Sequence, residues 1–211
     1  MNPRLAYDLE RAGPGLVAGA DEAGRGSLAG PLVAAAVLFD YACWSDDDFG
    51  DLADLDDSKR LSRRRREAVC GRVLRRARQV TVVSCAPQSI DGRGLQACNV
   101  GALERALALL SPTPRLAFVD GFPLKGSAVA HEALVGGDGR SAAVAAASVV
   151  AKVTRDRLMV RLHERFPQWG FVRHVGYASE EHRRAIVEHG VCELHRLSFD
   201  SVAYRQLDLR L

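Results

Sequence analysis

The chain has 211 residues, of which 47% are hydrophobic and 26% are charged, and its formal net charge is +3. A chain of this length and composition can bury a full core as one domain, which excludes disordered, collagen-like and coiled-coil proteins. No apolar run approaches the roughly 18 residues of a membrane-spanning helix, and the first residues lack the apolar stretch of a secretory signal. We therefore expect a soluble protein of the cytoplasm.

The N-terminal part predicts a long β-hairpin. Apolar strands at Leu16–Ala20 and Leu32–Phe39 are joined by the glycine-rich connection EAGRGSLAGP. The acidic stretch that follows, from Asp46 to Asp56, is typical of a solvated loop. Apolar residues at helical spacing then predict a helix over Ser62–Arg78, with Ser62 as its N-cap.

The rest of the chain alternates between strand and helix patterns. The predicted elements are a strand at Val80–Cys85, a helix at Leu95–Leu110, strands at Leu116–Val119 and Ala128–Val135, and helices at Ser141–Phe166 and Glu180–His189. Gly190 suits the position just after the last of these helices. Strands mixed with helices and opened by a hairpin predict an α/β layer fold with a mixed sheet.

Cysteine and histidine usage suggests no metal or disulfide chemistry. The five cysteines are an odd number without a C-x-x-C pair, so we expect reduced thiols. The six histidines show no ligand spacing, and we interpret His182 and His189 as surface or packing residues. The slightly positive net charge permits a nucleic-acid partner without requiring one.

Four carboxylates close predicted strands or follow them directly. They are Asp21 and Glu22 after the first strand, Asp120 in LAFVDG, and Asp138 in GGDGR ahead of the long helix. Acids held at the rim of a sheet repel one another, so a cluster of them needs a cation or shared protons. Oxygen ligands without Cys or His favour Mg²⁺ or Mn²⁺. Strand-end acids also serve as caps and turn formers, so the pattern alone leaves both interpretations open.

Two local features limit the geometry of such a site. Successive side chains of a strand point to opposite faces, so Asp21 and Glu22 share one site only if the strand ends or bulges there. Gly24 and Gly26 flank Arg25, and this segment is either a plain turn or a place where the backbone comes close to a ligand. It is neither a P-loop nor a dinucleotide-binding fingerprint.

In order along the chain, several segments resemble ribonuclease HII, the bacterial type 2 ribonuclease H. They are GADEAGRGSLAGPLVAAAV, DSKRLS, VDG, GGDGRSAAVAAASVVAKVTRD, WGFVRHVGYASEEH and HRLSF. The resemblance implies a ribonuclease H-like fold, with a catalytic domain over residues 1–166 and a helical substrate-binding extension over residues 167–211. It also implies endonucleolytic cleavage of the RNA strand of RNA–DNA hybrids, and of DNA duplexes at a single embedded ribonucleotide.

Position by position, the resemblance assigns roles to particular residues. The catalytic, metal-binding carboxylates of the family fall on Asp21, Glu22, Asp120 and Asp138. The family's element that senses the ribose 2′-hydroxyl falls on Gly24, Arg25 and Gly26, its sugar-packing tyrosine on Tyr177, and a lysine near the substrate backbone on Lys59. Ser148 and Lys152 lie in a matching segment, where we expect a structural role on the long helix.

The chain departs from the usual family sequence at four positions, and two other interpretations compete with this one. Ser27, Arg60, Val175 and Ser179 replace a proline, a lysine, a lysine and a threonine that are usual in the family. None of them touches the four carboxylates, so we expect an active enzyme. The type 3 ribonuclease H carries an extra N-terminal domain and a different residue between the two glycines. A catalytically inactive nucleic-acid-binding module of the same fold is the alternative from another class.

The implied chemistry suits these residue types. Two divalent ions, Mg²⁺ or Mn²⁺, can activate a water, stabilise the phosphate and neutralise the leaving oxygen, with the carboxylates as their ligands. We expect 3′-hydroxyl and 5′-phosphate products, and no sequence-specific base reading, since no recognition-helix or zinc-finger pattern occurs. The family default is a monomer, and recruitment by a sliding clamp is not readable from the sequence.

Overall fold

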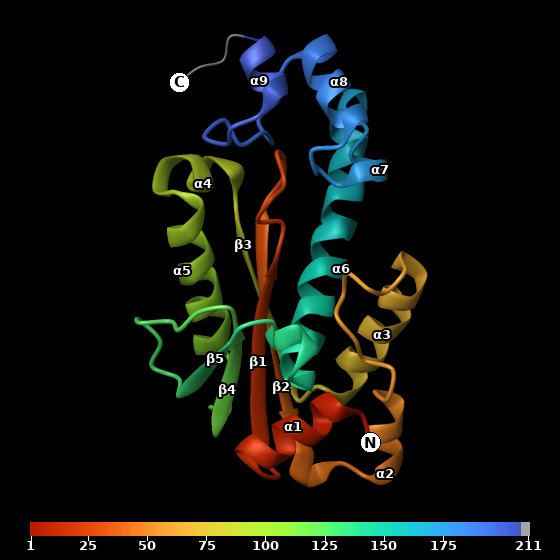
Figure 1. The fold of residues 1–211 in the computed structure, drawn as a ribbon, viewed down its shortest axis with the longest axis vertical. Coiled ribbons are helices and arrows are strands. Elements are labelled where there is room, and N and C mark those ends of the chain that lie inside the picture. The colour runs from red at the N-terminus through yellow and green to blue at the C-terminus, as the bar shows by residue number, and fades with distance from the viewer. Residues whose placement is uncertain (208–211) are drawn as a thin grey trace.

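Five strands form one mixed sheet in the computed structural model, which describes residues 1–207 (Figure 1). The strands are β1 (Leu16–Ala23), β2 (Leu32–Asp40), β3 (Gln79–Cys85), β4 (Leu116–Asp120) and β5 (His131–Leu134). Their order across the sheet is β3-β2-β1-β4-β5. The first three strands pair antiparallel, whereas β4 runs parallel to β1 and β5 parallel to β4. The predicted mixed sheet and its opening hairpin are confirmed.

The helices of residues 1–207 are α1 (Pro3–Ala12), α2 (Asp46–Asp51), α3 (Arg63–Arg76), α4 (Pro87–Arg93), α5 (Leu95–Ala108), α6 (Ala142–Arg165), α7 (Phe171–His174), α8 (Glu180–His189) and α9 (Val202–Gln206). Four of these helices, α3, α5, α6 and α8, follow the predictions closely, and five were not predicted as helices. Ser62 caps α3 by accepting from the Arg65 amide, and Gly190 follows α8 at positive φ, as predicted. Helices α1, α4, α7 and α9 were not predicted. Of the helices in the described part of the chain, none combines the length and apolar character that a membrane crossing requires.

The acidic stretch predicted as a loop is instead a short helix, α2. Ser45 caps it, because the Ser45 hydroxyl accepts from the Asp48 amide and the Asp48 carboxylate accepts from the Ser45 amide. Three aspartates in its first turn interact favourably with the positive end of the helix dipole. Arg76 of α3 pairs with both Asp48 and Asp51. The aspartates of α2 therefore offset positive charge on the arginine-rich helix α3, and these ion pairs hold the acidic stretch in place.

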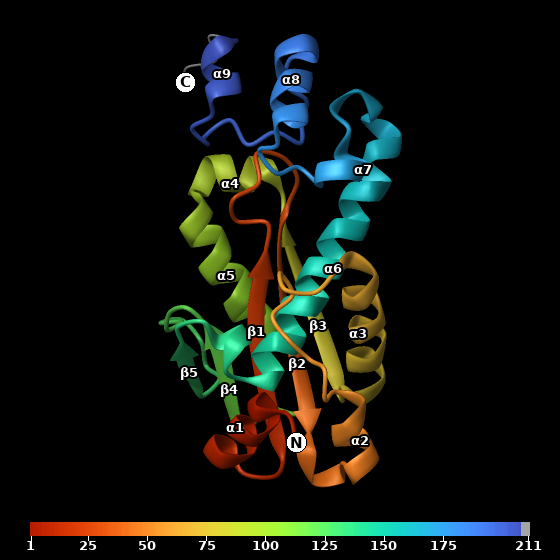
Figure 2. The same ribbon diagram turned by 45° about the vertical axis from the view of Figure 1, so that its right-hand side comes forward.

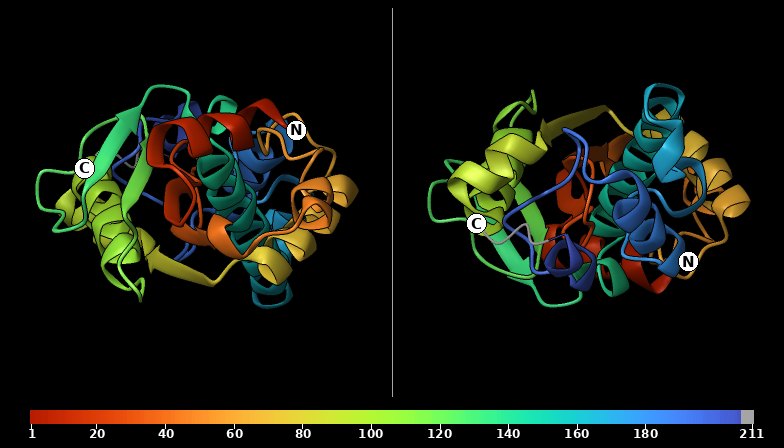
Figure 3. Two further views of the ribbon diagram at one scale, coloured as in Figure 1. Left: turned by 90° about the horizontal axis from the view of Figure 1, so that it is seen from below. Right: turned by 90° about the horizontal axis from the view of Figure 1, so that it is seen from above.

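Helices cover both faces of the sheet (Figures 2 and 3). Ala18 and Ala20 of β1 pack with α5 on one face, whereas Val17 packs with α6 on the other. This division follows the alternation of side chains along a strand. Alanines in the strands and in α6 let the layers approach closely. At Gly19 the approach is closest, because a Cβ there would lie 2.0 Å from the carbonyl carbon of Ala143.

The C-terminal segment packs over the end of the molecule to which the β1–β2 connection extends (Figure 1). Trp169, Phe171, Ile186 and Tyr204 form an apolar cluster there with Leu28, Ala29 and Met159. The cluster thus joins residues from both sides of the domain boundary predicted at residue 166, and that boundary stays a prediction. His182 is fully buried beside this cluster, and His189 is exposed, which agrees with packing and surface roles.

Candidate active site

The sheet topology brings three of the four predicted carboxylates together. Strands β1 and β4 are parallel neighbours, so their carboxyl ends lie at the same edge of the sheet. Asp120 is the last residue of β4, and Asp21 and Glu22 lie just past the last residues of β1 that pair with it. The Asp120 carboxylate accepts a 2.7 Å hydrogen bond from the Gly137 amide, which ties it to the turn that carries Asp138.

Asp21 and Glu22 do not end the strand, contrary to the sequence prediction. Strand β1 continues to Ala23, and its register with β2 is regular, with Asp21 opposite Ala35 and Glu22 opposite Ala34. The two side chains therefore point to opposite faces. Asp21 contacts Ser148 of α6, whereas Glu22 lies 3.4 Å from Arg25 and near Asn99 of α5. Both reach one cavity because β4 stops where β1 goes on.

This cavity has a volume of about 320 Å³ and is lined by all the predicted site residues except Asp138. Asp21 is buried, and the Glu22 side chain is 8% exposed. Gly24 sits in the left-handed region with φ +93°, and a Cβ there would lie 2.1 Å from Nε of Arg155. Only glycine fits that position, whereas the space beside Gly26 is open.

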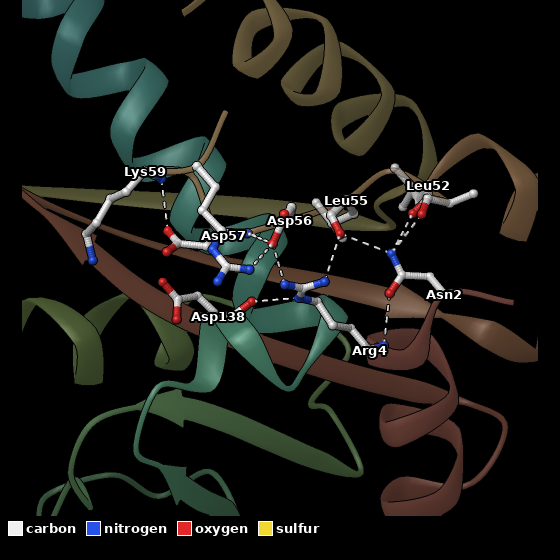
Figure 4. A network of polar contacts seen from close by, with 10 residues as sticks. Asn2, Arg4, Leu52, Leu55, Asp56, Asp57, Lys59 and Asp138 are labelled. Carbon is white, nitrogen blue, oxygen red and sulfur yellow. Dashed lines mark hydrogen bonds and ion pairs between the residues drawn. The ribbon is translucent and has the colours of Figure 1, made fainter. Parts of the chain in front are cut away.

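Asp138 lies beside the cavity, next to Asp57 and Lys59 (Figure 4). It sits in the short 3₁₀ turn Gly137–Gly139 that precedes α6. Its backbone carbonyl accepts a 2.9 Å hydrogen bond from Nε of Arg4, and Arg4 also pairs with Asp56. Helix α1, which the sequence did not predict, thus holds the Asp138 turn against the segment that carries Lys59.

The electrostatics are those of crowded carboxylates. Burial, followed by repulsion from Glu22, raises the pKa of Asp21 well above its usual value. Burial also raises the pKa of Glu22, and burial together with the Asp57 and Asp120 charges raises that of Asp138. Burial alone would lower the pKa of Lys59, but the surrounding carboxylates, Asp138 foremost, outweigh it and raise the pKa. The cavity therefore favours added positive charge.

Sequence reasoning gave no site role to several residues of the cavity wall. Ser148 and Lys152 lie on it, four residues apart on one face of α6, and so does Ser58. The Ser148 hydroxyl is 2.9 Å from that of Ser58 and contacts Asp21. The Lys152 ammonium lies 4.7 Å from the centre of the Tyr177 ring. The four-residue spacing was visible in the sequence, but the face of α6 that meets the cavity was not.

The donor set suits a hard divalent cation. Oε2 of Glu22 is buried and has no hydrogen-bond partner among residues 1–207, so it is an oxygen available as a ligand. Asp21 and Asp120 add carboxylates to the same cavity. Across residues 1–207, no group of three or more His, Cys, Asp or Glu side chains is already arranged to hold a metal ion.

Comparison with known proteins identifies the family. The family model of ribonuclease HII matches residues 18–202. Ribonuclease HII of Burkholderia mallei is 43% identical over 201 residues, which are 95% of this chain and 89% of that protein.

Two solved structures are similar over most of the chain. The ribonuclease H2 from Pyrococcus horikoshii is 25% identical with a TM-score of 0.73, covering 92% of this chain and 98% of that one. The ribonuclease HII in a PCNA complex from Archaeoglobus fulgidus is 28% identical with a TM-score of 0.72, covering 88% and 96%. The sheet, the flanking helices and these matches agree: the chain belongs to the ribonuclease HII family and is a ribonuclease H.

Proposed function

We propose that the protein cuts the RNA strand of RNA–DNA hybrids, and cuts DNA duplexes on the 5′ side of a single embedded ribonucleotide. The observation that carries this proposal is one cavity that holds the carboxylates of Asp21, Glu22 and Asp120 beside the backbone of Gly24–Gly26. Carboxylates supply the site of hydrolysis, and a close backbone approach supplies contact with the 2′-hydroxyl that distinguishes RNA from DNA. Such an activity suits the removal of ribonucleotides from DNA.

The chemistry needs divalent ions, and the family requires them. Two ions, Mg²⁺ or Mn²⁺, would activate water and stabilise charge on the phosphate and the leaving oxygen. Asp21, Glu22, Asp120 and Asp138 would hold them, and the buried, unpartnered Glu22 Oε2 supports this assignment. Asp21 is our candidate for the shared ligand, since it is buried and is close enough to both Glu22 and Asp120 for their charges to raise its pKa. The products would be a 3′-hydroxyl and a 5′-phosphate.

The remaining cavity residues would bind and orient the substrate. The Gly24–Gly26 backbone would contact the ribose, and Tyr177 would pack on the neighbouring sugar. Its ring lies next to two cations, Lys152 at 4.7 Å and Arg155 at 5.3 Å. Lys59, which also lines the cavity, would approach the substrate backbone. We place these contacts partly in the predicted C-terminal extension, residues 167–211, as a substrate-binding part of the protein.

The test is a labelled DNA duplex with one internal ribonucleotide, incubated with Mg²⁺ or with Mn²⁺. An all-DNA duplex and an EDTA sample are the controls. Asp120→Asn removes a carboxylate from the cavity, and Asp47→Asn makes the same change at an exposed position of α2. We expect one cut on the 5′ side of the ribonucleotide, lost with EDTA and with Asp120→Asn but kept in Asp47→Asn. Tight binding without cleavage under either metal would indicate an inactive binding module instead.

We also propose that the protein acts as a monomer that a sliding clamp can recruit. The support is the Archaeoglobus fulgidus relative, whose solved structure is a complex with PCNA. Co-elution of the full chain with the purified sliding clamp of its own host in size-exclusion chromatography tests this. Separate elution of the two proteins at micromolar concentrations would contradict it.

A further inference from the structure

Two fully buried arginines lie against the Gly24–Gly26 segment, and neither has yet been given a role of its own. Arg155 comes from α6, and Arg196 comes from the segment after α8, within HRLSF. Burial lowers the pKa of both, and for Arg196 the neighbouring Arg155 charge adds to this and brings the pKa to about 10. Within the described chain neither side chain forms an ion pair, so another interaction must account for burying them.

That interaction is with backbone carbonyls, five of them in the segment Gly24–Pro31 and one at Val175. Nη1 of Arg196 donates to the carbonyls of Gly24 at 2.7 Å and Arg25 at 3.1 Å, and its Nε donates to Gly30 at 2.9 Å. Arg155 donates to the carbonyls of three other residues, namely Ala29, Pro31 and Val175, at 2.9–3.0 Å. Of the two arginines, only Arg196 binds the carbonyls of Gly24 and Arg25; the Gly24 carbonyl also accepts a longer hydrogen bond, 3.4 Å, from the Ser27 amide.

Holding these two carbonyls also sets the direction of two amides. A trans peptide is planar, and its N–H points opposite to its C=O. The carbonyls of Gly24 and Arg25 point inward to buried Arg196, so the amides of Arg25 and Gly26 point outward, on the side of the cavity that these residues line. Neither amide donates to any group within residues 1–207. Both are therefore available to a ligand.

We propose that Arg196 is a positioning residue for ribose recognition, because it fixes the Gly24 and Arg25 carbonyls inward and so presents the Arg25 and Gly26 amides to the 2′-hydroxyl. This inference rests on the proposed function, in which the same backbone contacts the ribose. The guanidinium is itself held, because it stacks at 5.1 Å on the Phe199 ring. Asp91 accepts from the Leu197 and Ser198 amides at 3.0 Å and anchors the segment.

The experiment measures ribonucleotide preference rather than activity. Full-length protein carrying Asp120→Asn binds two fluorescent duplexes that differ only in one 2′-hydroxyl, and the ratio of the two Kd values is the readout. The variants are Arg196→Met and Arg196→Lys, and the matched controls are Arg155→Met and Arg155→Lys. The two arginines are equally buried, and each donates three hydrogen bonds to carbonyls. Thermal melts establish which variants fold.

We expect Arg196→Met to reduce the preference for the ribonucleotide-containing duplex about tenfold. That change corresponds to the loss of one hydrogen bond of about 1.4 kcal/mol. The Kd for the all-DNA duplex should change little. Arg196→Lys keeps the charge but lacks the planar guanidinium group, so the preference of this variant for the ribonucleotide-containing duplex should fall as well. If Arg196→Met does not fold, the two lysine variants carry the comparison. Equal losses in the Arg155 and Arg196 variants would overturn the inference, and so would full preference in Arg196→Lys.

The proposed function fails separately. A wild-type protein that leaves the single-ribonucleotide duplex uncut would refute that function. A wild-type protein that cuts it, with a preference unchanged in folded Arg196 variants, would refute only the role of Arg196.

Discussion

Replacing Gly19 by alanine should markedly lower the melting temperature of the protein, because β1 and α6 leave no space for the added methyl group. The added Cβ would lie 2.0 Å from the carbonyl carbon of Ala143 and 2.2 Å from the Val144 nitrogen, whereas unstrained carbon atoms stay about 3.5–4.0 Å apart. The obstacle is backbone, so no side chain can rotate away. Helix α6 would have to retreat from β1 by about 1.5 Å or the strand would have to bend.

The cost follows from this geometry. Overpacking a well-filled core costs about 1–3 kcal/mol and occasionally more, and a backbone clash belongs at the upper end. A loss of about 3 kcal/mol lowers the Tm of a chain this long by about 6–12 °C. Activity should fall too, because Ser148 and Lys152 belong to α6 and would move away from Asp21, which belongs to β1.

Urea denaturation followed by circular dichroism measures the free energy of unfolding, and Gly101→Ala is the matched control. Gly101 lies in α5, is exposed, and has nothing within 4 Å of the position of its Cβ. The same methyl group should there stabilise the helix by about 0.5–1 kcal/mol. If Gly19→Ala unfolds within 1 kcal/mol of the wild type, on the order of an ordinary surface change, the reasoning on the β1–α6 approach is wrong.

Three further predictions concern pH, the sugar contact and salt. Asp8 is buried against Tyr41 and the Ala143 amide, and burial raises its pKa from 3.8 to about 6. The stabilisation from protonated Asp8 is complete below pH 3.8 and is lost as pH rises through about 6, a change of about 3 kcal/mol. Asp8→Asn should flatten the dependence of unfolding free energy on pH across this window, and an unchanged slope in urea titrations would contradict it. Tyr177→Ala should lower kcat/KM on a single-ribonucleotide duplex about 5- to 150-fold, the range of one stacking contact, whereas Tyr177→Phe should stay near wild type in steady-state kinetics. Val175→Lys should steepen the plot of log Kd against log salt by about 0.9, the effect of one added phosphate contact, and parallel plots for variant and wild type would refute this.

The layer architecture and the strand-end acids could be predicted because they depend on local patterns. Apolar runs located the strands, and parallel neighbours necessarily bring Asp21 and Asp120 to one edge of the sheet. Helix α1 carried recognisable signals as well, an Asn2 cap and Pro3 in its first turn, but it is short and mostly polar.

What could not be predicted depends on contacts between distant parts of the chain. Strand β1 continues to Ala23 because β2 pairs with it as far as Val33, beyond the last pair with β4, and the residues of β1 alone do not encode that pairing. Arg4 reaches Asp138 across 134 positions, and Arg196 reaches Gly24 across 172. Arginine is usually a surface residue, so composition and periodicity give no sign that Arg196 is completely buried.

The apolar cluster that joins the C-terminal helices to the rest of the protein limits how this fold can be recombined. Leu28 and Ala29 belong to the connection between the first two strands, yet they complete the cluster around Trp169 and Phe171. In a chimaera that exchanged only the residues after 166, the C-terminal part of the apolar cluster would come from one relative. The connection between β1 and β2, which completes the cluster, would come from the other. A functional graft would have to carry Gly24–Pro31 along with the C-terminal helices, so the smallest transplantable module is discontinuous in sequence.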